Sequence, residues 1–154
     1  MRPRPVTDAD APCLIALIDR CFADYPGCVL DTLVEEPALQ APHTVYTAKG
    51  GQVWVVANGP DIKASVGLMP DGNGWQLIKL YVHPSAQGLG LGQHLLAFAE
   101  DEARRRGAQG LSLWSDTRFV KAHALYKKNG YCKGGTRALH DLSATTEFFF
   151  EKAF

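Results

Sequence analysis

The chain has 154 residues, of which 46% are hydrophobic and 21% charged, with a formal net charge of zero. This length is typical of one domain, so we expect a single domain over residues 1–154. The charge balance argues against a nucleic-acid-binding protein. The one basic run, at residues 104–106, is too short to form the basic patch or stripe that such proteins carry.

Composition also argues against a membrane or metal protein. No apolar run reaches the roughly 18 residues of a membrane span, and the start of the chain, M-R-P-R-P-V, lacks the apolar segment of a signal peptide. We therefore expect a cytoplasmic protein with no membrane partner. The histidines and the four cysteines show no metal-ligand spacing, so no metal is expected.

The N-terminal part predicts a short strand, a helix and an irregular segment. Residues 3–7 are extended in pattern, and Asp8 or Asp10 is expected to cap a helix that ends near residues 25–27. In residues 28–43 the pattern is weaker. One or two helical turns are expected at residues 30–36, broken by Pro37 and Pro42. This segment either shapes a substrate pocket or serves as a connector.

Three antiparallel strands are predicted next. The apolar run at residues 51–57 indicates a strand buried on both faces, and a hairpin turn at residues 58–61 leads to a returning strand at residues 62–68. A second turn at residues 71–74 leads to the central strand, residues 77–82.

The central strand is followed by a glycine-rich loop and a long amphipathic helix. The loop contains Gly88, Gly90 and Gly92, and the helix carries an apolar stripe from Leu91 to Ala103. Glycines let an anion approach the backbone, and the free N–H groups and dipole at a helix N-terminus favour negative charge there. The arrangement predicts a phosphate-binding loop, with an ordinary strand-to-helix turn as the alternative.

The rest of the chain alternates strand and helix before two final strands. A strand at residues 111–115 is followed by a helix that starts at Asp116 or Thr117 and ends before Gly130, and strands follow near residues 131–139 and 146–154. The helical crossover from the central strand makes residues 111–115 its parallel neighbour. Two such strands can splay apart and admit a thin, linear molecule.

Two motifs give the chain a family resemblance. The loop has the form Q-x-x-G-x-G at Gln87, Gly90 and Gly92, without the Lys of a P-loop or the spacing of a dinucleotide fold. The second motif is A-H-A-L-Y-K-K-N-G-Y at residues 122–131. Together with the order of elements, they resemble the GCN5-related N-acetyltransferase (GNAT) family. The resemblance implies an α/β, mostly antiparallel sheet with a splayed parallel central pair and helices on both faces.

The resemblance also implies a cosubstrate and site residues. It implies acetyl-CoA, with its pyrophosphate on the loop and its pantetheine arm along the central strand, and Tyr126 as the acid that protonates the departing thiolate. The implied cofactor-binding residues are Leu80, Tyr81, Val82, Gln87, Gly88, Leu89, Gly90, Leu91, Gly92 and Gln93. The acceptor would be the primary amine of a small molecule or peptide, and a homodimer is left open.

Three positions depart from the family pattern. Phe119 stands where the family often has an Asn that contacts the pantetheine arm, and Gln87 where it often has an Arg. Gln76 replaces a Glu that is the usual candidate for general base. The sequence therefore assigns no base, and deprotonation through water or by a group outside the central strand is expected.

Several side chains allow two interpretations. Tyr126 shares a helical stripe with Phe119 and is either an acid or a core residue. His123 is either a base or an exposed or capping imidazole, and Asp116 is either an N-cap or an acceptor-site carboxylate. His140 and Asp141 either line the acceptor pocket or form a solvated turn.

The leading function is an N-acetyltransferase that acts on a small-molecule or peptide amine by direct attack. The alternatives are a protein N-terminal or lysine acetyltransferase and a non-catalytic acyl-CoA-binding sensor. The segments expected to form the acceptor pocket, residues 28–43 and 137–146, carry no motif that identifies the amine.

Overall fold

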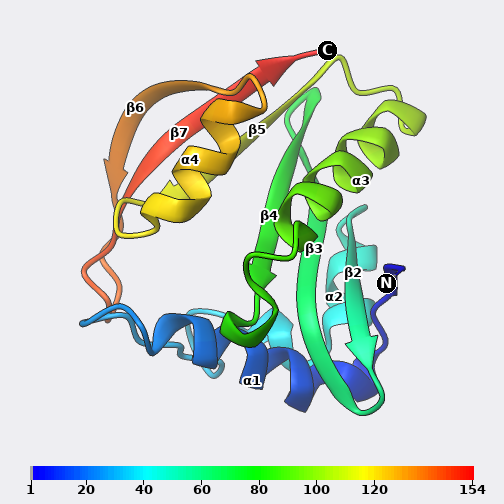
Figure 1. Cartoon of the computed structure of the whole chain (residues 1–154), viewed down its shortest axis with the longest axis vertical. Coiled ribbons are helices and arrows are strands. Elements are labelled where there is room, and N and C mark those ends of the chain that lie inside the picture. Colours follow the sequence, from blue (N-terminus) through cyan, green and yellow to red (C-terminus); the bar gives the residue numbers. More distant parts are fainter. Residues whose placement is uncertain (1) are drawn as a thin grey trace.

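The computed structural model describes residues 2–154, which contain a seven-stranded sheet in the order β1-β2-β3-β4-β5-β7-β6 (Figure 1). The strands are β1 Arg4–Pro5, β2 Gln52–Asn58, β3 Asp61–Asp71, β4 Gly74–Val82, β5 Gly110–Asp116, β6 Cys132–Ala138 and β7 Thr146–Ala153. Neighbouring strands are antiparallel except for β4 and β5, which are parallel. The predicted mixed, mostly antiparallel sheet is confirmed.

Helices cover both faces of this sheet, as expected (Figure 1). The helices are α1 Ala11–Phe22, α2 Pro42–Ala48, α3 Leu91–Arg105 and α4 Val120–Lys128. Side chains of α3 and α4 pack with Val56, Leu113 and Phe150 on one face. Those of α1 and α2 pack with Val53 and Val55 on the other. Alternate residues of β2 thus enter both cores, which explains its continuous apolar run.

The segment before β2 differs from the expectation. Residues 30–36, where helical turns were expected, contain no helix. Residues 32–35 form a turn, which is closed by a hydrogen bond of 2.8 Å from Glu36 N to Asp31 O. Pro37 and Pro42 do not break helices; Pro37 begins a 3₁₀ turn and Pro42 begins α2, because proline, which lacks an N–H, fits the first turn of a helix. The sequence analysis therefore missed α2.

The N-terminus also differs in detail. The strand predicted at residues 3–7 is confined to β1, and Val6 N continues the contact to Val53 O at 2.9 Å. Asp8 does not cap α1: its carboxylate accepts from Thr44 N, in the first turn of α2, over 3.0 Å. Asp10 is the residue before α1, but its side chain pairs with Arg4 instead of capping the helix.

The parallel strands β4 and β5 diverge toward the C-terminal end of β4 (Figure 1). β4 also carries a β-bulge there: Ile78 lies opposite Gly67 and Tyr81 opposite Ser65, so two residues of β4 face one of β3. Lys79 in the bulge has a φ of +53°, which is uncommon for a residue with a side chain. Ser65 Oγ donates to Lys79 O over 2.7 Å and holds this conformation.

Candidate active site

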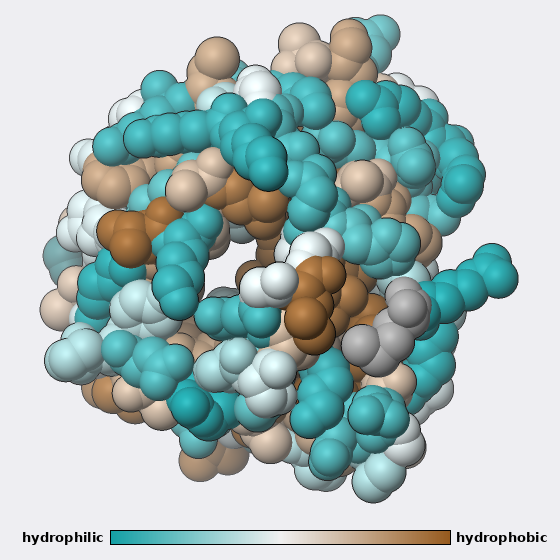
Figure 2. Space-filling model, viewed as in Figure 1, coloured by the Kyte–Doolittle hydropathy of each residue, from teal (hydrophilic) through white to brown (hydrophobic). Residues whose placement is uncertain are grey.

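A cleft of about 700 Å³ runs from the glycine loop into the gap beyond β4. Figure 2, which has the same view as Figure 1, shows the molecule hollowed near its middle. The cleft is lined by Cys21, Asp24, Tyr25, Leu80, Tyr81, Val82, Ala86, Gln87, Gly88, Gly90, Leu91, Gly92, Gln93, Phe119, Val120, Lys121, Ala122 and Leu125. The structure therefore brings together nine of the ten predicted cofactor-binding residues. The tenth, Leu89, is 75% exposed at the loop and does not line the cleft.

The glycines of the loop serve two different needs. Gly88 and Gly90 have φ values of +79° and +76°, a left-handed conformation that favours glycine, and Gly90 is the N-cap residue of α3. Gly92 has an ordinary φ, but a Cβ there would lie 3.5 Å from Leu125 Cδ2 and 3.8 Å from Val82 Cγ2, in the mouth of the cleft. The first two glycines thus shape the turn, and the third keeps the entrance wide.

The N-terminus of α3 and a lysine make this end of the cleft favourable for an anion. The first N–H groups of α3 have no partner within the helix, and its dipole adds partial positive charge. Lys121, on the first turn of α4, lies across the cleft with Nζ 3.5 Å from Gln87 Oε1. The sequence analysis missed Lys121, which supplies a charge that Gln87 lacks. A phosphate group fits this arrangement.

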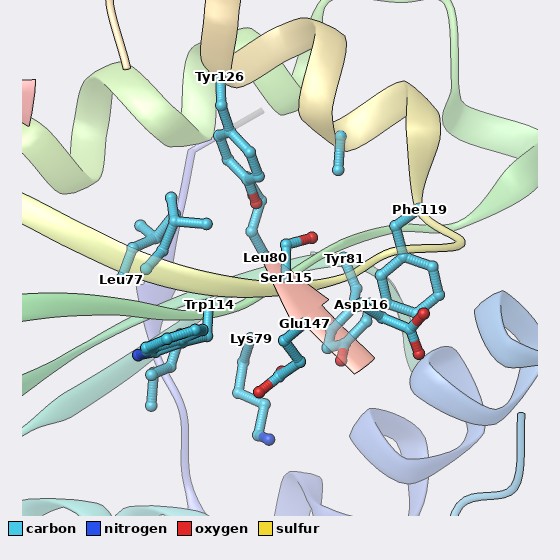
Figure 3. Close-up of a pocket in the computed structure, with 13 residues that line it drawn as sticks. Leu77, Lys79, Leu80, Tyr81, Trp114, Ser115, Asp116, Phe119, Tyr126 and Glu147 are labelled. Carbon is cyan, nitrogen blue, oxygen red and sulfur yellow. The ribbon is translucent and has the colours of Figure 1, made fainter. Parts of the chain in front are cut away.

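The cleft leads to an inner cavity of about 90 Å³ between β4 and β5 (Figure 3). The two share Leu80, Tyr81, Phe119 and Ala122. The inner cavity adds Leu77, Ile78, Lys79, Leu113, Trp114, Ser115, Asp116, Tyr126 and Glu147. A thin molecule that enters along the loop would therefore end among polar side chains of β4, β5, α4 and β7.

Tyr126 packs in the core and also reaches the inner cavity. Its ring packs in the core, 5.5 Å from the Phe150 ring, and the residue is 5% exposed. Its hydroxyl points into the space between Leu80 and Ser115 (Figure 3). Within residues 2–154 the Tyr126 hydroxyl has no hydrogen-bond partner. Every fully buried side-chain oxygen or nitrogen in this part of the chain does have one, so the hydroxyl must border the open cavity. Burial raises the pKa of Tyr126 well above its usual value, which keeps the phenol a proton donor.

The expectation that Asp116 caps the next helix is wrong. α4 begins at Val120, with Phe119 as its N-cap residue. The Asp116 carboxylate instead accepts from Arg118 N at 2.9 Å and from Arg118 Nε and Nη2 at 3.0 and 2.9 Å. This double attachment folds residues 116–118 into a turn, and α4 starts only after it.

Arg118 also joins two distant segments into a wall beside the cavity. Its guanidinium donates to Ser143 O at 3.1 Å and to Pro26 O at 3.5 Å. Val29 N donates to Ser143 Oγ at 2.7 Å, and Leu142 N donates to a Glu35 oxygen at 3.0 Å. Residues 26–35 thus meet residues 142–143 (Figure 1), and Arg118 ties both segments to Asp116, which lines the inner cavity.

His140 and Asp141 form a turn, the second of their two interpretations. Asp141 accepts from Thr145 N and Oγ1 at 2.8 and 2.7 Å, and within the described part of the chain neither residue lines the cleft or the inner cavity. His123 is neither exposed nor a cap: it is 7% exposed, beneath β5 and β7.

Charged and aromatic side chains that the sequence did not single out lie on the side of the gap away from α4. Lys79 Nζ lies 2.9 Å from both carboxylate oxygens of Glu36. Glu147 accepts from Arg137 Nε at 2.8 Å, and this guanidinium lies 4.2 Å from the centre of the Trp114 ring. These residues belong to four different strands and, for Glu36, to the segment before α2, so no local sequence pattern could link them.

Comparison with known families is decisive. A model of the acetyltransferase (GNAT) domain matches residues 49–133, more than half of the chain, from the start of β2 to the start of β6. The chain belongs to the GNAT acetyltransferase family. The matched range contains the loop, most of the residues that line the cleft, and Tyr126. The resemblance is therefore confirmed, and the expected enzyme class, an acetyl-CoA-dependent N-acetyltransferase, is confirmed with it.

Relatives of this GNAT domain are found among bacterial acetyltransferases. The chain is 28% identical over 134 residues to the uncharacterized N-acetyltransferase YjgM of Escherichia coli, covering 83% of this chain and 80% of the relative. It is 32% identical over 128 residues to the mycothiol acetyltransferase of Beutenbergia cavernae, covering 81% of this chain but 42% of that longer protein.

Solved structures share the fold of this GNAT domain over its whole length. A GNAT acetyltransferase from Staphylococcus aureus has a TM-score of 0.84 at 20% identity, covering 99% of this chain and 98% of that one. YncA from Salmonella typhimurium, solved with acetyl-CoA, has a TM-score of 0.76 at 20% identity, covering 99% of this chain and 93% of that one.

Within residues 2–154, none of the helices has the length and apolar character needed to span a membrane.

Proposed function

We propose that this chain transfers the acetyl group of acetyl-CoA to the primary amine of a small molecule by direct attack. The observation that supports the proposal is that the cleft at the glycine loop and the inner cavity at Tyr126 share lining residues and so adjoin, which makes a path from the loop to the Tyr126 hydroxyl. A long molecule with phosphates at one end and a thioester at the other fits such a path.

The residues on this path suit the parts of acetyl-CoA. The pyrophosphate would be held by the N–H groups of residues 87–92 and by the charge of Lys121. The pantetheine arm would lie along Leu80–Val82, where β4 has left β5 and its backbone groups on that edge face the cleft. A backbone N–H of this edge would polarise the thioester carbonyl and hold the oxyanion that forms on attack.

Tyr126 would act at the departure of the sulfur. A thiol has a pKa near 8.5 in water, so a buried phenol that stays protonated can donate to the thiolate as it leaves. The acceptor must be a neutral amine when it attacks, and an alkylamine with a pKa near 10.4 is largely protonated at pH 7. A group in the cavity has to remove that proton.

The wall formed by residues 26–35 and 142–143 supports a small acceptor. These bonded segments are tied through Arg118 to Asp116 at the cavity, and we expect them to hinder a peptide or protein terminus, which would need an open groove. The names of two relatives support a small acceptor as well. One is a mycothiol acetyltransferase, and the other, matched over 56 residues at 38% identity, is an aminoalkylphosphonate N-acetyltransferase. The Tyr126 hydroxyl at the cavity argues against a sensor without catalytic function.

An acetyl-CoA thiol-release assay across amine classes tests this function. Small primary amines should release CoA faster than peptides with free N-termini or lysines. Turnover of peptides alone would establish the protein acetyltransferase, and tight acetyl-CoA binding without turnover of any amine would establish the sensor. A cytoplasmic location and the oligomeric state remain predictions, to be checked by cell fractionation and light scattering.

A further inference from the structure

Ser115 and His123 form a buried polar pair beside the reaction cavity. His123 Nε2 lies 3.1 Å from Ser115 Oγ, and each residue is 7% exposed. Ser115, near the end of β5, lines the inner cavity with Tyr126. His123 comes from α4, one turn before Tyr126, and does not itself line the cavity.

The aromatic neighbours of His123 offer no packing reason for an imidazole. Its ring lies 5.4 Å from the Phe148 ring and 5.3 Å from the Phe150 ring, both on β7. An apolar side chain would pack there without the cost of burying a polar group, which is offset only by a hydrogen bond. The hydrogen bonds of the ring, to Ser115 Oγ and to the backbone of Asp116, therefore distinguish histidine from leucine at this position.

The position of Ser115 supplies what the central strand lacks. Gln76 on β4 cannot act as a carboxylate base, and the nearby carboxylate of Asp116 is engaged by Arg118. The Ser115 hydroxyl lies on the same side of the gap as Tyr126 (Figure 3). A weak acid such as a serine hydroxyl needs a partner base to take a proton, and His123 is within hydrogen-bond distance.

We propose that Ser115 takes the proton of the attacking amine and passes its own hydroxyl proton to His123. This inference rests on the proposed function. Ser115 is then a catalytic residue, because it touches the amine, and His123 is a positioning residue that acts through Ser115. The relay requires the His123 tautomer with the proton on Nδ1, which leaves Nε2 free to accept.

The proton balance closes over one cycle. The acceptor arrives as an ammonium and gives one N–H proton to Ser115 Oγ, while the Oγ proton moves to His123 Nε2. The neutral nitrogen then bonds to the thioester carbon, the C–S bond breaks, and Tyr126 donates its proton to the sulfur. The second proton that the nitrogen loses on becoming an amide passes through water in the cavity to Tyr126, and the imidazolium returns the first proton through Ser115 to water. The products are the amide, the free thiol and one proton released to water.

The charges around His123 favour the neutral base. Burial is the largest cause that lowers the pKa of His123 below its usual value, and the charges of Lys133 on β6 and Lys127 on α4 lower this pKa further. A hydrogen bond to the backbone of Asp116 on β5 and the charge of Asp116 raise it, but the net shift is downward. On β7 the uncharged side chains of Phe148 and Phe150 face the ring. At pH 7 the imidazole is therefore neutral and able to accept a proton.

The test compares Ser115→Ala and His123→Gln with wild type and with His94→Gln, which alters an exposed histidine on α3. Both relay variants should keep acetyl-CoA affinity within a few-fold by calorimetry and lose about 10²-fold in kcat. The decrease of wild-type kcat/KM on the acid side, below pH 6.5, should disappear in His123→Gln and persist in His94→Gln. An acceptor whose amine is already neutral at pH 7 should lose much less rate in either variant.

Three results would overturn the relay. One is an unchanged pH profile in His123→Gln, and another is an equal loss of rate for amines of low and high pKa. The third is an acetylated Ser115 found by mass spectrometry after mixing with acetyl-CoA, since it would make Ser115 a nucleophile. If a variant fails to fold, an NMR titration of wild type decides: the His123 resonances must shift with the same pKa as the acid limb. Inactivity of wild type toward every amine would refute the proposed function, whereas these results concern the relay alone.

Discussion

Gln76 of β4 lies opposite Ser112 of β5, and in residues 2–154 this is the one register pair that joins the two parallel strands. β5 instead pairs with β7 along its whole length, from Gly110 to Asp116. The sheet is therefore nearly divided in the middle, and the edge of β4 beyond Gln76 is free to bind something other than a strand. The cleft, the inner cavity and Tyr126 all lie at this division.

Gly90→Val should weaken acetyl-CoA binding by about tenfold or more, which is about 1.4 kcal/mol. The reason is the φ of +76° at Gly90, which a β-branched residue adopts only at a cost, so the loop would turn its N–H groups away from the anion. Isothermal titration calorimetry with acetyl-CoA measures the loss.

Gly107→Val is the matched control for the loop. Gly107 follows the C-terminal end of α3 and has a φ of +82°, so the variant carries a similar backbone strain far from the cleft. It should lower the melting temperature and leave acetyl-CoA affinity unchanged. Equal affinities of Gly90→Val, Gly107→Val and wild type would refute the loop as the phosphate site.

Tyr126→Phe should lower kcat by about 10²-fold while acetyl-CoA affinity stays within a few-fold. The ring keeps its packing against Phe150, and no hydrogen bond within the described chain is lost with the hydroxyl. Steady-state kinetics and a thermal melt of the same sample separate the two effects. An unchanged kcat would mean that water protonates the thiolate.

Tyr131→Phe is the control for loss of a buried phenol. The Tyr131 hydroxyl donates to Glu100 over 2.8 Å, outside the cleft and the inner cavity. Its removal leaves a buried carboxylate with one partner fewer and should lower stability by about 1–3 kcal/mol with little effect on kcat. A similar loss of kcat in both variants would point to a general disturbance of α4 rather than to acid catalysis.

Local patterns predicted the half of the site that is contiguous in sequence. The strand, the three glycines and α3 follow one another within about thirty residues, so one stretch of chain contains both the turn and the anion site. Tyr126 was found through its motif. Lys121 was missed because its approach to Gln87 depends on how α4 crosses the gap, which no local spacing encodes.

Features that depend on distant contacts could not be predicted. The bulge at Lys79 is held by Ser65 of the neighbouring strand, and nothing in the composition of β4 marks a left-handed residue there. The start of α4 was placed too early because Asp116 and Thr117 are good cap residues, whereas Arg118 engages the Asp116 carboxylate instead. In both cases a tertiary contact overrides a local preference.

Arg118→Lys should raise the KM for the amine several-fold without changing acetyl-CoA affinity. A lysine cannot reproduce the fork of contacts to Asp116, Ser143 and Pro26, so the wall beside the cavity would loosen. Kinetics at saturating acetyl-CoA measure this effect. Arg20→Lys, which alters an exposed ion pair with Asp24, is the control and should leave KM unchanged. Equal KM values for wild type and Arg118→Lys would show that the wall does not contact the acceptor.

Asp10→Asn should remove a pH-dependent part of the stability. The hydrogen bonds from Arg4, at 2.8 and 2.9 Å, are the largest cause that lowers the pKa of Asp10 from 3.8 to about 2. Because the folded state binds this proton less readily than the unfolded chain, the stabilisation is complete above about pH 4 and is lost as the pH falls toward 2. Arg4 is partly exposed, so we expect about 1 kcal/mol rather than the full value of the shift.

Urea unfolding of wild type and Asp10→Asn between pH 2 and pH 6 measures this contribution. The two curves of unfolding free energy against pH should be about 1 kcal/mol apart near pH 6 and converge as the pH approaches 2. Asp24→Asn, which breaks the exposed pair with Arg20, should follow wild type throughout. A constant gap between wild type and Asp10→Asn would show that the loss comes from the altered turn at Thr7, which donates to the same carboxylate, and not from the ion pair with Arg4.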